Sequence, residues 1–204
     1  MKFKNLKTLL LVFASICLFA CSDDDNNGGG GTINTNSIKA IVGCEGGMDA
    51  GGSAIEAQLD LIYEDLSMQK NAFEVVNGRP LGAIAQSITE IDDKLFITLS
   101  NSAKIEVVNK ADLKSIATIA DKDKRMATPQ YIVDLGNDRA VVSELYSNHL
   151  VIIDTKKYEV IATVSTKDHV KEMLKVGDKL FAAENDRIEV FTVTKGTLSS
   201  TSQV

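Results

Sequence analysis

Short runs in which apolar and polar residues alternate recur along the second half of this chain. They are rich in β-branched residues and are bounded by aspartate, asparagine and glycine, a pattern typical of β-strands that end in tight turns. Three of these turns contain Asp93, Asp138 and Asp178, which are 45 and 40 positions apart. Ten to twelve residues after each turn comes one alternating run, and these runs are 104–108, 149–153 and 187–191.

The repeat predicts four strands in each unit. The first full unit has strands at 86–91, 94–99, 103–108 and 114–119, and the second at 130–135, 138–143, 148–153 and 158–164. The third has strands at 170–176, 179–183 and 187–193 followed by a frayed end, and an earlier, weaker unit has 38–43, 55–63 and 71–76.

A four-stranded repeat of about 40–45 residues is the period of a β-propeller blade. We therefore predict an all-β fold, a β-propeller of four-stranded antiparallel blades over residues 37–204; a sandwich or meander is the alternative. The residues from 32 onward hold about four blades at roughly 43 residues a blade. Residues 197–204 do not resemble a closing strand, so the expected fold is an incomplete arc of about four blades, as in a fragment or truncated reading frame.

The first twenty residues predict an export signal. Three lysines precede an apolar run over 9–20, which is too short to span a bilayer but suits a signal-peptide core. The run closes in Leu18-Phe19-Ala20-Cys21, which resembles the lipobox of bacterial lipoproteins. The resemblance implies that 1–20 is removed and that Cys21 is lipidated; an ordinary secretory signal is the alternative.

The segment 21–36 is rich in aspartate, asparagine and glycine and predicts a solvated tether. Its acidic start, Asp23-Asp24-Asp25, resembles the surface-export signal of Bacteroidetes lipoproteins. That resemblance implies an outer-membrane lipoprotein exposed at the cell surface.

Charge and cysteine content limit the possible partners and disulfide bonds of the chain. The chain has 22 basic and 28 acidic residues; residues 1–20 hold three lysines and no acid, so the remainder has a net charge of −9. A domain this acidic, with no basic stripe, argues against a nucleic-acid partner. With Cys17 in the signal and Cys21 lipidated, Cys44 is left without a disulfide partner in the chain.

No pattern of catalytic or metal-ligating residues stands out. His149 and His169 lack the spacing partners of a zinc site, and 121–125 begins like a calcium loop but lacks its later ligands. Glu144 and Glu184 follow corresponding second strands, where some lactonase-like propellers hold metal, but no matching histidine or asparagine set accompanies them. We expect no cofactor, no metal and no catalytic residue.

The repeats resemble the YVTN (YncE-like) propellers. Asn109 and Asp154 occupy the acid or amide position after the third strand, and the closing phrase is Ala117-Thr118-Ile119 in one unit and Ala162-Thr163-Val164 in the next. This resemblance covers most of 80–195 and implies a ring of seven blades in the family.

A narrower resemblance lies in segments 77–82, 85–87 and 144–148. They are similar to YncE-like surface lipoproteins of Bacteroidetes, whose members include cobalamin-capturing propellers that work with a TonB-dependent transporter. The chain departs from that group between Gly43 and Glu56, where a glycine-rich stretch is unusual.

In a propeller, the loops between second and third strands share one face with the loops between blades. The predicted strands place amides, one tyrosine and one arginine on that face, which suits hydrogen bonding to a large polar solute. The candidate ligand-binding residues are Asn77, Arg79, Asn101, Glu144, Tyr146, Asn148 and Asn185, with Met126 and Glu184 beside them.

Three functions remain open at this point. The first is a lipid-anchored surface propeller that captures a corrinoid or another large nutrient for an outer-membrane transporter. The second is a propeller enzyme of the lactonase or quinoprotein kind, and the third is an adhesion or scaffold module with a protein partner.

Overall fold

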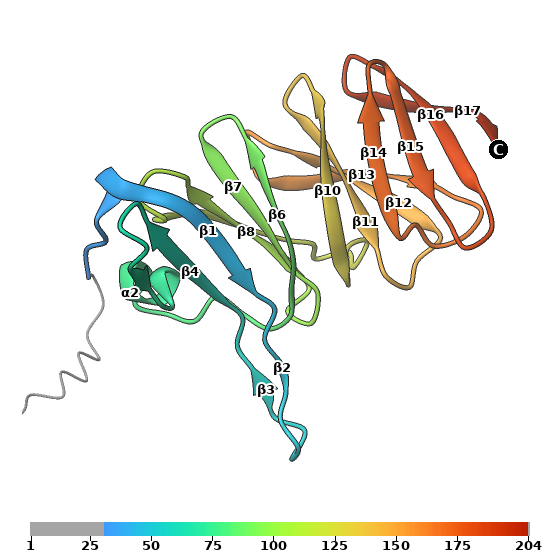
Figure 1. The fold of residues 1–204 in the computed structure, drawn as a ribbon. Helices are drawn as coiled ribbons and strands as arrows, with labels where there is room; N and C mark the ends of the chain where they lie inside the picture. Colours follow the sequence, from blue (N-terminus) through green and yellow to red (C-terminus); the bar gives the residue numbers. More distant parts are fainter. Residues whose placement is uncertain (1–30, 204) are drawn as a thin grey trace, which may run out of the picture.

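In the computed structural model, which describes residues 31–203, four antiparallel β-sheets stand one behind another in a row (Figure 1). Sheet 1 consists of β1 (Ile38–Cys44), β4 (Gln58–Tyr63) and β5 (Met68–Gln69). It is preceded by a 3-10 turn, η1 (Thr35–Ser37), and followed by α2 (Ala72–Asn77). A hairpin of β2 (Gly47–Met48) and β3 (Ala54–Ile55) projects between β1 and β4 (Figure 1).

The other three sheets each contain four strands in sequence order. Sheet 2 is β6 (Ala85–Ile91), β7 (Lys94–Leu99), β8 (Lys104–Asn109) and β9 (Ser115–Ala120). Sheet 3 is β10 (Pro129–Gly136), β11 (Arg139–Glu144), β12 (His149–Asp154) and β13 (Glu159–Ser165). Sheet 4 is β14 (Glu172–Val176), β15 (Lys179–Ala183), β16 (Ile188–Thr194) and β17 (Thr197–Gln203). This is an incomplete arc of propeller blades, as the repeat predicts.

Tight turns between the first and second strands fix the pairing in each sheet. Asp92, Asn137 and Gly177 begin these turns with φ values of 55°, 53° and 60°. Aspartate, asparagine and glycine tolerate positive φ better than other residues, so the local sequence selects a two-residue hairpin. The first two strands of all three sheets therefore pair where the sequence predicts.

The core consists of apolar layers between neighbouring sheets. Leu59, Leu61 and Phe73 of sheet 1 and α2 pack against Leu95 and Ile97 of sheet 2. The next two layers form in the same way between sheets 2 and 3 and between sheets 3 and 4. Side chains of a strand point alternately forward and backward, so every middle sheet contributes to two layers.

Hydroxyl groups also tie sheet 2 to sheet 3. Ser87 Oγ and Thr98 Oγ1 donate to the carbonyl oxygen of Gln130 over 2.8 and 2.6 Å, and Ser100 Oγ donates to Pro129 O over 2.7 Å. Two residues further along both strands, Thr89 Oγ1 donates to Ile132 O over 3.3 Å, so β6 and β10 run in the same direction side by side. Corresponding ends of successive sheets consequently lie at the same edge of the array.

Three predicted elements differ from the structure. The strand predicted over 55–63 is divided between β3, which ends at Ile55, and β4, which begins at Gln58 in another sheet. Residues 71–76, predicted as a strand, lie mostly in helix α2, which ends where Gly78 at φ 65° donates its N–H to Glu74 O. The sequence Phe73-Glu74-Val75-Val76 is compatible with either a strand or a helix. The helix is favoured because it buries both Ala72 and Phe73 against β4.

The frayed end predicted for the last unit is the regular strand β17. Lys195 and Gly196, at φ 50° and 74°, make a tight turn, and the strand pairs with β16. Its serines and threonines gave no apolar signal. Backbone pairing requires none, and Thr201 Oγ1 adds a hydrogen bond to Val190 O.

Candidate functional site

One edge of the array collects the turns that join second and third strands, residues 100–103, 145–148 and 184–187. The linkers between sheets, 121–128 and 166–171, reach the same edge because four antiparallel strands return the chain to the side where it entered. We call this side the candidate edge, and the side with the 92–93, 137–138 and 177–178 turns the opposite edge.

Four predicted ligand-binding residues lie exposed on turns of the candidate edge. Tyr146 is 80% exposed, and Asn148 follows it in the same turn of sheet 3. Asn101 and Asn185 take the corresponding turns of sheets 2 and 4, where Asn185 Nδ2 donates to Asp168 Oδ2 over 2.6 Å. The structure therefore brings an exposed aromatic ring and three amides to one edge.

Glu144 lies at this edge but is buried. Its Oε2 accepts the backbone N–H groups of Ala127 and Thr128 over 2.9 and 2.8 Å, in the linker that leads into its own sheet. Glu184 does the same in sheet 4, where its Oε1 accepts from Lys167 and Asp168 over 3.1 Å each. Both carboxylates hold linkers in place.

Burial leaves one oxygen of each carboxylate without a hydrogen bond, Oε1 of Glu144 and Oε2 of Glu184. Arg187 Nε lies 3.5 Å from Glu184 Oε2, a distance that allows electrostatic attraction only. Burial raises the pKa of Glu144, and the two linker N–H groups oppose that rise only in part.

Asn77 does not lie on the candidate edge, contrary to the sequence prediction. It ends α2, and its Nδ2 donates to Phe73 O and Leu113 O over 2.9 Å each. Its Oδ1 accepts the N–H of Ser115 over 2.8 Å. Leu113 belongs to the β8–β9 turn at the opposite edge, so Asn77 fastens the helix there.

Arg79 is drawn into sheet 2 and does not line the candidate edge. Its Nη2 lies 2.6 Å from Glu106 Oε1 and 3.0 Å from Ser115 Oγ, and its guanidinium stands 5.0 Å above the ring of Phe73. Glu106 is fully buried, and Lys104 Nζ lies 3.6 Å from its Oε2. Arg79 thus neutralises a buried carboxylate. The segment from Asn77 to Ala83 crosses from the opposite edge to the candidate edge. The sequence prediction placed Asn77 and Arg79 on the candidate edge because it took 71–76 as a strand.

The β2–β3 hairpin leaves sheet 1 at the candidate edge, next to sheet 2 (Figure 1). The carbonyl of Glu45 accepts from Ala85 N over 2.9 Å, and its Oε1 accepts from Gln86 Nε2 over 2.7 Å. Met48 and Ile55 are exposed on the hairpin. Sequence reasoning marked this glycine-rich stretch as unusual but did not predict that it extends the edge.

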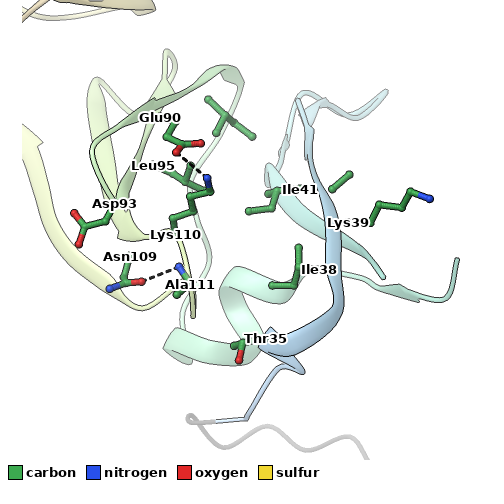
Figure 2. A pocket seen from close by; sticks show the side chains of 12 residues that line it. Thr35, Ile38, Lys39, Ile41, Glu90, Asp93, Leu95, Asn109, Lys110 and Ala111 are labelled. Carbon is green, nitrogen blue, oxygen red and sulfur yellow. Dashed lines mark hydrogen bonds and ion pairs between the residues drawn. The ribbon is translucent and has the colours of Figure 1, made fainter. Parts of the chain in front are cut away.

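A cleft opens at the opposite edge between β1 and sheet 2, with a volume of about 790 Å³ (Figure 2). Ile38, Ile41 and Leu95 line it, and Lys110 Nζ bonds Glu90 Oε1 over 2.7 Å in its wall. The cleft lies between η1 and β1 on one side and β6, the β6–β7 turn and the β8–β9 turn on the other. No sequence signal predicted it, since its walls come from segments far apart in the chain.

The two histidines serve local contacts. His149 Nε2 lies 2.8 Å from Arg125 O, and His169 Nδ1 lies 3.0 Å from Asp168 Oδ1. Within residues 31–203, no three histidine, cysteine, aspartate or glutamate side chains are grouped to hold a metal ion. Over the same range, no helix has the length and apolar character needed to cross a bilayer.

The cysteines divide between the described and the undescribed part of the chain. Cys44 Sγ lies 3.7 Å from Asp60 Oδ2, and burial raises the pKa of its thiol. The predicted lipidation site, Cys21, lies outside the described residues, as do the signal over 1–20 and residues 21–30 of the predicted tether. The end of that tether, 31–36, is described: Gly31 N donates to Val75 O over 2.9 Å, and Ile33 packs against the core.

The chain matches no model of a known protein family and no curated protein sequence. Its fold is similar to a functionally unknown protein from Desulfotomaculum acetoxidans, with a TM-score of 0.58 and 14% identity over 74% of this chain and 49% of that one. It is similar to hydrazine synthase of Kuenenia stuttgartiensis, with a TM-score of 0.50 and 17% identity over 74% and 46%. For the dihydro-heme d1 dehydrogenase NirN the TM-score is 0.51, with 11% identity over 77% and 36%.

This chain therefore spans less than half the length of each of these three structures. Hydrazine synthase and NirN contain propeller-like folds, and at such low identities the likeness shows the β-propeller fold alone.

Proposed function

We propose that this protein is a lipid-anchored binding protein of the bacterial outer membrane that captures a large polar solute at the candidate edge. Tyr146 is the observation that carries the proposal, because a tyrosine ring 80% exposed on a short turn offers a flat face that no neighbour covers. Such a ring stacks on a planar ligand and can also donate a hydrogen bond.

The amides around the tyrosine suit binding better than acid–base chemistry. Asn101, Asn148 and Asn185 each offer donors and an acceptor without charge. Two buried carboxylates at this edge, those of Glu144 and Glu184, already accept linker N–H groups. The ligand chemistry that fits is a large planar molecule with amide groups at its periphery, and a corrinoid has this character.

The cell-surface setting and the transporter partner rest on the resemblance to YncE-like lipoproteins of Bacteroidetes. In this proposal Cys21 carries the lipid, the aspartate-rich tether directs the protein to the outer face, and a TonB-dependent transporter receives the captured solute. The β2–β3 hairpin, which extends the candidate edge, would then lie beside the ligand.

Calorimetric titration of the purified protein with cyanocobalamin tests the proposal. We expect saturable binding that Tyr146→Ala weakens by about thirtyfold, since loss of a stacking anchor typically costs ~2 kcal/mol. The control is Leu66→Ala, an exposed apolar residue in the β4–β5 turn at the opposite edge, which should leave affinity unchanged.

Two results would contradict the proposal. Binding that survives Tyr146→Ala at full strength would place the ligand elsewhere. If the wild-type protein does not bind cyanocobalamin, a corrinoid is not its ligand. If it also gives no binding heat with any other large polar nutrient in a series, the proposed capture function is wrong.

A further inference from the structure

The face of sheet 4 that points away from sheet 3 is apolar and exposed. Leu174, Val176, Phe181 and Ile188 are 63%, 57%, 36% and 41% exposed, and they line a groove of about 410 Å³. Only one charged residue, Glu172, lines this groove. Apolar side chains gathered on one sheet face in this way are typical of an interaction surface.

The same strand positions are fully buried in the preceding sheets. Phe181 is the third residue of β15, as Phe96 is of β7 and Val141 of β11. Both Phe96 and Val141 have no exposed surface, because the following sheet covers them. Phe181 is therefore exposed because, within residues 31–203, no sheet covers that side of sheet 4.

A second position repeats the relationship. Ile188 pairs with Ala183 in sheet 4, as Ile105 pairs with Thr98 in sheet 2. Ile105 is fully buried in the layer between sheets 2 and 3, whereas Ile188 is 41% exposed. The forward face of sheet 4 thus carries the phenylalanine and isoleucine that sheet 2 presents to sheet 3.

We infer that this face is the docking surface of a further four-stranded sheet of the same repeat, attached to sheet 4 as sheet 3 is to sheet 2. The layer between sheets 2 and 3 combines Phe96 with the small side chains Ala140 and Val142 of the following sheet. The incoming sheet should likewise carry small aliphatic residues in its second strand.

An extended protein tests this directly. A second copy of residues 121–165, which comprise the linker into sheet 3 and sheet 3 itself, is placed after residue 203, in a chain carrying Ile188→Cys. Labelling of the thiol at position 188 by a small reagent is followed by mass spectrometry of its peptide. We expect labelling at least about tenfold slower than in the unextended Ile188→Cys chain, because a covered side chain reacts only on local opening.

A matched control carries Val142→Asp in the appended copy alone. A buried unpaired carboxylate should prevent stacking, so the thiol should label as fast as in the unextended chain. Protection that persists in this control would overturn the inference, because it would not depend on the face of the added sheet.

A second extension keeps the test decisive if the first does not fold. It appends residues 166–203, so that sheet 4 follows itself, and the same slow labelling is expected. If neither extension protects the thiol, no such sheet docks here. If the unextended chain becomes protected as its concentration rises, the occupant is a second copy and the inference is wrong.

Discussion

Glu144 and Glu184 lie 40 positions apart and make the same contact in successive sheets. Each buried carboxylate accepts two backbone N–H groups from the linker that leads into its own sheet. The linker leads into the first strand, and the glutamate is the last residue of the second strand in sheet 3 and the residue after it in sheet 4. The contact therefore holds the start of the first strand against the end of the second. The pair is a structural device of the repeat.

Removal of this acceptor should destabilise the fold. Glu144→Ala removes the carboxylate that accepts the N–H groups of Ala127 and Thr128, and a hydrogen bond to a charged group contributes about 1.5–3 kcal/mol. We expect the free energy of unfolding in urea to fall by ~2 kcal/mol or more. Glu90→Ala, at a half-exposed glutamate of sheet 2, is the control and should cost under about 0.5 kcal/mol. Equal losses in both variants would contradict the assigned role.

The raised pKa of Glu144 also predicts a pH dependence. A carboxyl whose pKa is higher in the folded than in the unfolded protein favours folding when protonated, and that contribution declines as pH rises through the folded pKa. Wild type should therefore lose stability relative to Glu144→Gln as pH rises from about 4, the unfolded pKa, to neutrality. Thermal melts of the two proteins across this range measure the difference, and parallel curves would refute it.

Asp121 should show the opposite sign. The Arg125 side chain bonds its carboxylate, with Nη2 at 2.8 Å, and holds the pKa of Asp121 below its usual value despite burial. The ionised carboxylate of Asp121 therefore stabilises the folded protein above its unfolded pKa of about 3.9, and this stabilisation is lost as pH falls through the folded pKa. Asp121→Asn should be less stable than wild type at neutral pH, and the difference should vanish in acid.

Asp123→Asn is the matched control for this pH series. Asp123 lies in the same linker, also faces Arg125 Nη2 at 3.5 Å, and is largely exposed. Its replacement should leave both the stability and its pH dependence close to wild type, because exposed ion pairs contribute little. An Asp123→Asn profile like that of Asp121→Asn would mean that general charge, not the buried contact, sets the dependence.

Arg79 should matter for stability even without a ligand. Arg79→Ala leaves Glu106, which is fully buried, with Lys104 as its remaining cationic partner. Truncating one partner of a buried pair is costly, and because Arg79 is partly exposed we expect a loss of about 1–3 kcal/mol in urea unfolding. Adding Glu106→Gln to Arg79→Ala should recover part of that loss; no recovery would show that the arginine acts through packing on Phe73 alone.

Cys21 should determine where the protein resides. If it carries lipid, Cys21→Ala should release the protein from the membrane fraction or leave the signal unprocessed. Fractionation of cells and the mass of the N-terminal peptide measure both outcomes. Normal processing after residue 20 together with normal membrane fractionation of the variant would end the lipoprotein hypothesis.

The repeating strands could be predicted because their signals are local. The turns at Asp92, Asn137 and Gly177 specify hairpins through their own backbone preferences, and alternation over the following residues specifies the strands. Sheets 2 and 3 consequently lie within a residue or so of their predicted bounds. The last strand escaped prediction because serine and threonine side chains give no periodic apolar signal, although their backbones pair with β16.

The candidate edge was only partly predictable. Tyr146, Asn148 and Asn101 follow from the strand order, since their turns belong to the regular sheets. Asn77 and Arg79 did not, because their positions depend on a helix within sheet 1 and on polar partners more than 25 residues away. Long-range hydrogen bonds of this kind leave no trace in a single sequence.

The hydroxyl bonds from Ser87, Thr98 and Ser100 to the next sheet have a mechanical consequence. Each sheet of a linear array contacts only its immediate neighbours, so under force the sheets should unfold one at a time. Sheets 2 and 3 are joined by these bonds as well as by their shared apolar layer, whereas sheets 1 and 4 each have one neighbouring sheet within residues 31–203. A steady pull on the two ends of the chain should therefore detach one of these outer sheets first and separate sheets 2 and 3 last.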